Sequence, residues 1–125
     1  MLYALNATGS RRVAWTYRAG APLRGTPALG AGTVYLGAND GTLTALDRAD
    51  GRVKWVFRAE HTDDRAFVFF STALEHEGRV YVGAADRRLY CLDAATGAPL
   101  WQTPLGDWIR SRPVVAGDRV LVAAL

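Results

Sequence analysis

The sequence of 125 residues contains one cysteine and one lysine, and it has no long hydrophobic run. Because Cys91 is alone, an intrachain disulfide is excluded, and its apolar segment favours a packing role over a reactive one. No stretch approaches the roughly 18 consecutive apolar residues that a membrane-spanning helix needs. The start also lacks a basic and apolar leader, so we expect no signal peptide and no membrane insertion by this segment.

Helical patterning is missing as well. No amphipathic stretch of three turns occurs. Instead, runs of four to six residues rich in Val, Tyr, Leu, Trp and Thr are separated by Gly, Asp or Asn every 8 to 12 residues. This pattern is typical of short β-strands. The sequence therefore predicts an all-β fold.

What the sequence does contain is a repeat. Its tryptophans Trp15, Trp55 and Trp101 are spaced 40 and 46 residues apart, close to the period of one propeller blade. Each follows an apolar strand and a turn containing Gly, and further segments align between them, such as TPAL, STAL and RPVV. Each repeat is therefore predicted to be four short strands, A to D. The copies around the tryptophans span 2–20, 43–60 and 89–106.

The repeat predicts a partial propeller with open ends. The chain begins with a C and D pair and ends with an A and B pair, so it supplies half, two whole and half blades. Propellers close with four to eight blades, so one copy does not close a ring. The predicted units are 1–20, 21–60, 61–106 with a longer connection, and 107–125. The predicted strands are 26–29, 33–37, 42–47 and 52–58 in the first whole blade, and 71–74, 79–83, 89–93 and 99–103 in the second.

The same residue types recur in each turn between strands C and D because the conformation of the turn requires them. Asp47 and Asp93 stand where a carboxylate accepts hydrogen bonds from backbone N–H groups two or three residues on, and Gly51 and Gly97 stand where a positive φ is needed. In the first copy we expect Asn6 and Gly9 to serve the same purpose. The Trp that follows carries about 200 Å² of apolar surface, which one sheet cannot bury alone. We therefore expect each Trp to pack against the next blade.

The pattern Ala-Leu-Asp-x-x-x-Gly-x-x-x-Trp at 45–55, repeated with Cys91 in place of Ala at 91–101, resembles the tryptophan-docking repeat of the quinoprotein-type β-propellers. That family includes pyrroloquinoline quinone (PQQ) dehydrogenases, a scaffold lipoprotein of outer-membrane barrel assembly, and extracellular sensor domains of bacterial kinases. The first copy departs from the pattern by one residue inserted between Ala4 and Trp15. The resemblance implies an extracytoplasmic compartment and assigns blade docking to Trp15, Trp55, Trp101, Gly9, Gly51, Gly97, Asp47 and Asp93.

The resemblance also raises the question of a quinone cofactor. In the dehydrogenases of this family, PQQ lies in the central funnel with an aromatic platform, a vicinal disulfide, calcium carboxylates and an Asp base. A single cysteine excludes that disulfide, and no motif marks the calcium ligands. We therefore expect no catalysis and no cofactor in this chain, with PQQ and calcium compatible only with a complete parent propeller. A fragment of a quinoprotein dehydrogenase is the alternative.

The sequence was also searched for a metal site and for a nucleic-acid-binding surface. Metal-ligand types occur in two groups, but we place the first in a D-to-A connection and the second in an A-to-B turn, at opposite ends of a blade, so no metal site is expected. Fourteen arginines are scattered over turns and strand edges rather than clustered with aromatics, which disfavours nucleic-acid binding. The two groups of metal-ligand residue types are His61, Asp63 and Asp64 in the D-to-A connection, and Glu75, His76 and Glu77 in the A-to-B turn.

The D-to-A connections, 19–25, 59–70 and 104–111, are the best candidates for a binding site because they differ in length and ring the mouth of a propeller. Arg24 and Arg110 occupy equivalent positions, three residues before a proline. The sequence thus predicts a non-catalytic interaction scaffold or ligand-sensing module. Its partner would be a protein or peptide, an anionic ligand, the rest of a parent propeller, or a second copy joined through open blade edges. The candidate rim comprises Arg24, Arg65, Phe69, Asp107, Trp108 and Arg110.

Overall fold

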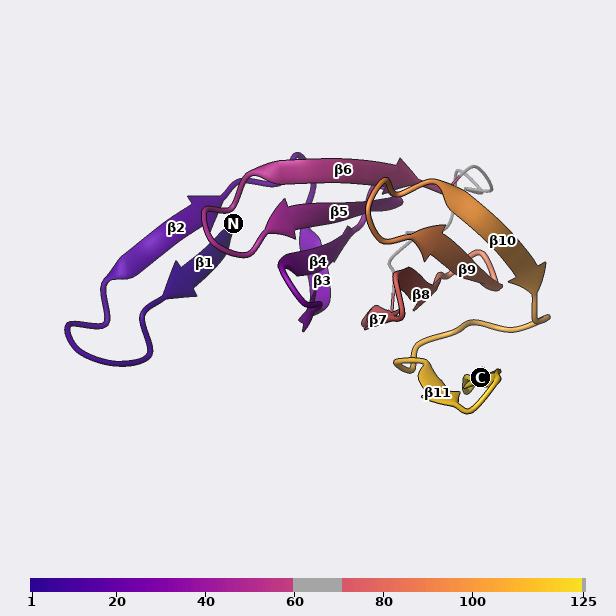
Figure 1. Ribbon diagram of the computed structural model, residues 1–125. Coiled ribbons are helices and arrows are strands. Elements are labelled where there is room, and N and C mark those ends of the chain that lie inside the picture. The colour runs from indigo at the N-terminus through magenta and orange to yellow at the C-terminus, as the bar shows by residue number, and fades with distance from the viewer. Residues whose placement is uncertain (60–70, 125) are drawn as a thin grey trace.

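The computed structural model describes residues 1–59 and 71–124, and within them all regular structure is β (Figure 1). No helix in these two stretches is long and apolar enough to cross a membrane. The strands are β1 (Leu2–Leu5), β2 (Val13–Tyr17), β3 (Leu23–Leu29), β4 (Thr33–Ala38), β5 (Thr42–Asp47), β6 (Val53–Arg58), β7 (Leu74–His76), β8 (Arg79–Gly83), β9 (Arg88–Asp93), β10 (Pro99–Pro104), β11 (Val114–Ala116) and β12 (Arg119–Leu121).

These strands form four antiparallel sheets in the order that the repeat predicts. Strands β3-β4-β5-β6 make one four-stranded blade and β7-β8-β9-β10 make another, while β1-β2 and β11-β12 are two-stranded hairpins. Figure 1 shows the sheets following one another along an open arc, with the two hairpins at its opposite ends. The prediction of a partial propeller of half, two whole and half blades is confirmed.

The second and third strands of each blade are the most reliably predicted elements. Strands β5 and β8 have the predicted bounds, and β4 and β9 each extend by one residue. Their side chains are buried on both faces, because neighbouring sheets cover each side of the blade. Near-continuous apolar runs are the expected signature of strands buried in this way.

The first strand of each blade differs from the prediction. In the second blade it covers Leu74–His76 instead of 71–74, so Glu75 and His76 belong to a strand, and only Glu77 and Gly78 form the turn. Ser71 precedes the strand, and its hydroxyl accepts a hydrogen bond from the Gly83 N–H at 2.9 Å. In the first blade the strand begins three residues earlier than predicted, at Leu23. Gly25, Thr26 and Pro27 in its middle obscure this strand in the sequence.

The hydrophobic core lies between sheets rather than within them. One cluster joins the two whole blades and includes Trp55, Tyr35, Val80 and Leu92. A second cluster joins the hairpin β1-β2 to the first blade, where Trp15 packs beside Val34, Leu36 and Leu46. Each blade is therefore stabilised mainly by its neighbours, as in other repeat architectures.

A polar contact near the inner strands adds to this packing. Glu75 on β7 accepts a hydrogen bond from the Ala31 N–H of the first blade at 2.8 Å, and another from the Tyr35 hydroxyl. Its carboxylate fills the space beside Gly30, where an added Cβ would lie 2.3 Å from the Glu75 Oε1 atom. Burial and the contact with Glu75 raise the pKa of Tyr35, so its hydroxyl stays protonated as a donor. The other first strands carry Leu29 and Val115 at this position, so the contact belongs to one blade pair.

Candidate functional site

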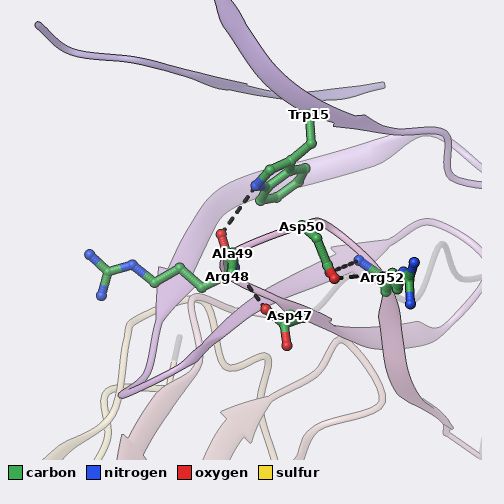
Figure 2. A network of polar contacts seen from close by, with 6 residues as sticks. All are labelled: Trp15, Asp47, Arg48, Ala49, Asp50 and Arg52. Carbon is green, nitrogen blue, oxygen red and sulfur yellow. Dashed lines mark hydrogen bonds and ion pairs between the residues drawn. The ribbon is translucent and has the colours of Figure 1, made fainter.

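The turn between β5 and β6 receives Trp15, the first tryptophan of the repeat (Figure 2). The Trp15 indole N–H donates a hydrogen bond to the Arg48 carbonyl at 3.1 Å. Its ring lies on Gly51, where an added Cβ would be 2.5 Å from a ring carbon and φ is 78°. Asp47 holds the turn by accepting a hydrogen bond from the Ala49 N–H at 2.7 Å. Glycine is required here for two reasons, a positive φ and the close approach of the indole.

Trp55 makes the same contacts with the next blade. Its indole N–H donates to the Ala94 carbonyl at 2.9 Å, and its ring lies on Gly97, where an added Cβ would be 2.5 Å from the ring. Asp93 accepts hydrogen bonds from the Ala95 and Thr96 N–H groups at 2.8 and 3.1 Å. Trp15 and Trp55 thus each insert into the C-to-D turn of the following blade. In both, the indole N–H and the ring contact that blade.

Trp101, the third tryptophan, has no following C-to-D turn within the described residues. Its exposed fraction is 39%, against 7% for Trp55. One side of it faces Tyr81, with ring centroids 6.1 Å apart. Trp101 is therefore the one repeat tryptophan that inserts into no turn within the described residues.

At the other end of the series, the turn between β1 and β2 has no tryptophan inserted into it. An added Cβ on Gly9 would meet no atom within 4 Å. The residue four before Trp15 is Arg11, and its φ of 53° matches the left-handed conformation of Gly51 and Gly97, which stand four before their own tryptophans. Arg11 therefore takes the place of the turn glycine in this copy, and Gly9 lies two residues before that place.

The predicted rim is built around the connection between β10 and β11. Ile109 is almost fully buried and packs on Gly83, where an added Cβ would lie 2.1 Å from the Ile109 Cγ2 atom. It also forms a β-bridge with Ala124. Further along, the Ser111 hydroxyl donates to the Ala123 carbonyl at 3.1 Å and accepts from the Ala123 N–H at 3.0 Å. The connection is therefore fixed to the blade at both ends of Arg110.

Two rim residues are presented outward from this fixed connection. Trp108 is 41% exposed, and the Arg110 guanidinium carbon lies 5.1 Å from the centre of its ring, in cation–π geometry. Asp107 accepts a hydrogen bond from the Trp108 N–H at 2.8 Å. The three predicted residues Asp107, Trp108 and Arg110 thus form one exposed group, which we call the Arg–Trp pair with its capping aspartate.

The remaining rim predictions fall in other places. Arg24 lies within β3, opposite Gly37, and not in a connection as predicted. The register nevertheless keeps it equivalent to Arg110, because Leu23 pairs with Ala38 as Ile109 pairs with Ala124. Arg65 and Phe69 lie outside the described residues, as do His61, Asp63 and Asp64.

Metal-ligand types do not gather in the part of the chain that is described. There, no group of three or more His, Cys, Asp and Glu side chains is arranged to hold a metal ion. Glu75 is committed to the blade contact, and the His76 Nε2 atom lies 3.7 Å from Glu77 in an exposed pair. Cys91 is fully buried in β9, and its burial raises the pKa of the thiol.

Sequence reasoning missed the residue that positions this site, Ile109, and it also missed the contact that Glu75 makes between blades. Ile109 anchors the connection beneath the Arg–Trp pair, and its signal was a single apolar residue within a polar segment. Glu75 was assigned to a turn, because a short strand with a charged residue has no alternating apolar pattern. Glu75 was hidden because the first strand of a blade is brief, and Ile109 because it lies in a connection without a repeating apolar pattern.

Comparison with known proteins agrees with this architecture. The family model for outer membrane protein assembly factor BamB matches residues 1–74 and 68–125. BamB from Moraxella catarrhalis is 22% identical with a TM-score of 0.77, over 92% of this chain and 38% of that one. We found no match among curated proteins.

Quinone enzymes share the same repeat. The quinohemoprotein alcohol dehydrogenases of Comamonas testosteroni and Pseudomonas putida HK5 are each 28% identical to this chain, with TM-scores of 0.66 and 0.71. The alignments cover 82% and 87% of this chain but only 17% and 18% of theirs. The chain thus spans well under half the length of each of these solved structures. Because the family model matches the chain from end to end, the chain belongs to the family of outer membrane protein assembly factor BamB, with PQQ-like propeller repeats.

Proposed function

We propose that this chain is a non-catalytic interaction scaffold that binds a protein or peptide partner through the Arg–Trp pair with its capping aspartate. The observation that carries the proposal is an exposed, stacked Trp108 and Arg110 on a connection fixed by Ile109. Trp and Arg are enriched among residues that dominate binding energy at protein interfaces. The family description, outer membrane protein assembly factor, also names a role in assembly and not in catalysis.

The geometry suits an acidic or aromatic segment of a partner. Stacking on Trp108 holds the Arg110 guanidinium in place, which lowers the side-chain entropy lost when it binds a carboxylate. The remaining face of the indole offers apolar area beside that charge. Because the connection is already anchored, binding would require little further ordering of the backbone.

Peptides selected from a random display library on the immobilised chain provide the test. We expect Trp108→Ala and Arg110→Ala each to weaken the selected peptides at least tenfold, equivalent to about 1.4 kcal/mol or more. Arg112→Ala is the matched control, because Arg112 is also exposed and lies two residues from Arg110. Peptides that bind Trp108→Ala as tightly as the unchanged chain would contradict the proposal.

A fragment of a quinone enzyme is the second candidate, favoured by the 28% identity to two quinohemoprotein dehydrogenases. The described residues do not fit the cofactor. Cys91 is buried in β9 and has no cysteine beside it, while the rings of Trp15 and Trp55 face the glycines of the next blade. We therefore propose that the chain binds no PQQ by itself, and that such binding requires the rest of a complete propeller.

Titration with PQQ in the presence of calcium tests this part of the proposal. We expect no saturable change in the absorbance of PQQ when the chain is added. Free PQQ with calcium and an unrelated protein of equal concentration serve as controls for non-specific adsorption. A saturable change with a fixed stoichiometry would favour the enzyme-fragment alternative.

A further inference from the structure

Arg87 has a backbone conformation that suits glycine. It lies in the turn between β8 and β9 with a φ of 67°, in the left-handed region that is unfavourable for a residue with a Cβ. In the first blade the equivalent residue, between β4 and β5, is Gly41, with a φ of 82°. The turn is therefore built with glycine in one blade and with arginine in the next.

The backbone of Arg87 is held in this conformation from two sides. Its N–H donates to the Ala84 carbonyl at 3.2 Å, and its carbonyl accepts from the Leu105 N–H at 2.9 Å. Gly41 makes the same two kinds of hydrogen bond, at 3.2 and 3.0 Å. Because the backbone bonds are the same, the turn itself gains nothing from the arginine. An unfavourable φ that the surrounding structure holds in place is a reason to look for a function of the side chain.

The side chain of Arg87 is available to a ligand. The residue is exposed, and within residues 1–59 and 71–124 its guanidinium makes no hydrogen bond or ion pair. The carboxylate of the preceding residue, Asp86, is occupied within the turn. It accepts hydrogen bonds from the Arg88 N–H at 3.1 Å and from the Tyr90 hydroxyl. The positive charge of Arg87 is therefore not paired by its own turn.

The turn that carries Arg87 is attached to the connection that carries the Arg–Trp pair. Leu105, which donates to the Arg87 carbonyl, is the first residue of that connection after β10. Near the other end of the connection, Ile109 packs on Gly83 at the end of β8. Trp108 is three residues from Leu105, at most about 11 Å along an extended chain. Arg87 and the Arg–Trp pair thus lie at the same end of the blade, within the span of one short peptide.

We propose that Arg87 is a second binding residue beside the Arg–Trp pair, and that the partner is an acidic segment with one carboxylate for Arg87 and another for Arg110. This inference rests on the proposed function and narrows its partner to a segment with at least two Asp or Glu residues. A guanidinium binds a carboxylate through two parallel hydrogen bonds. Asp107, which accepts a hydrogen bond from the Trp108 N–H, offsets only one of the two positive charges.

Arg11 provides a matched comparison for Arg87. It is also exposed and has a φ of 53°. Arg11 follows β1, the third strand of its blade, whereas Arg87 precedes β9, so the two residues lie at opposite blade ends. Arg11→Gly and Arg87→Gly therefore remove the same charge and the same unfavourable φ, but only the second removes the proposed contact. The midpoint of thermal unfolding should stay the same or rise in both variants, since glycine suits a positive φ.

Fluorescence anisotropy with a short labelled peptide that has an aspartate on each side of a tryptophan tests the proposal. The same peptide with both aspartates replaced by asparagine is its neutral counterpart. We expect Arg87→Gly to raise the Kd of the acidic peptide at least about fivefold, and Arg11→Gly to change it less than about twofold. For the neutral peptide, Arg87→Gly should change the Kd less than about twofold, because no carboxylate is left to pair.

Three results would overturn this inference. The first is an Arg87→Gly variant that binds the acidic peptide as tightly as the unchanged chain, and a loss with Trp108→Ala would then leave the proposed function standing. The second is an equal loss with Arg11→Gly, which would reveal a general effect of charge. The third is an unchanged chain that does not bind the acidic peptide, in which case the display selection alone decides the proposed function. A loss with Arg87→Gly but none with Trp108→Ala would contradict the proposed function and support the Arg87 contact.

Discussion

Replacing Trp55 by Ala is expected to lower the free energy of unfolding by about 3 to 5 kcal/mol, the usual range for truncating a buried tryptophan. The ring is 7% exposed in the core between the two whole blades. Its loss leaves a cavity beside Tyr35 and removes the donor to the Ala94 carbonyl, 2.9 Å away. The measurement is urea denaturation followed by circular dichroism at one fixed protein concentration.

Trp108→Ala is the matched control for that experiment. Trp108 is 41% exposed and stands on a connection, so its truncation should cost less than about 1 kcal/mol. The two variants remove the same side chain, so the difference between their free energies of unfolding measures what docking between blades contributes. A loss below about 1 kcal/mol for Trp55→Ala would mean that the blade contact carries little of the stability.

Gly97→Ala is expected to destabilise the chain by about 2 to 5 kcal/mol, because two costs combine. The φ of 75° costs an L-residue about 1 to 2 kcal/mol. The added methyl would also lie 2.5 Å from the Trp55 ring, so the indole or the turn must shift, at a further cost of about 1 to 3 kcal/mol. Chemical denaturation of the purified variant measures the sum.

Gly78→Ala separates those two costs. Gly78 has a φ of 76°, almost the same as that of Gly97, but an added Cβ there meets no atom within 4 Å. We expect Gly78→Ala to show the backbone cost alone, about 1 to 2 kcal/mol. Equal losses in the two variants would show that the indole yields without cost, and that tight contact with the glycine does not hold the blades together.

The repeated part of the fold was predictable from sequence for a physical reason. Strands β5 and β8 lie between other strands and between other sheets, so their inner residues must be uncharged and able to pack in a strand. The first strands carry no such requirement, and their prediction failed by up to three residues. In the second blade, Glu75 and His76 were expected in a turn but lie in β7. Glu75 contacts Ala31 and Tyr35 of another blade, and no local sequence pattern encodes that contact.

The candidate site was predictable only in part. The spacing before two prolines predicted that Arg24 and Arg110 are equivalent, and the register places them so. It could not reveal that Arg24 is in a strand, nor that Arg110 stacks on Trp108. Stacking depends on the path of the connection, which the buried Ile109 sets by packing on Gly83 of another strand.

The sequence by itself determined the architecture of this protein. A period of about 40 residues, a turn with Asp and Gly, and a following Trp permit few ways to bury the indole, and blades stacked side by side are the solution that buries every copy. Only the tertiary structure decided how the ends of the series differ from its middle. It left Trp101 half covered and placed Arg11 where the other turns have glycine, because those positions depend on a neighbouring blade that local sequence does not specify.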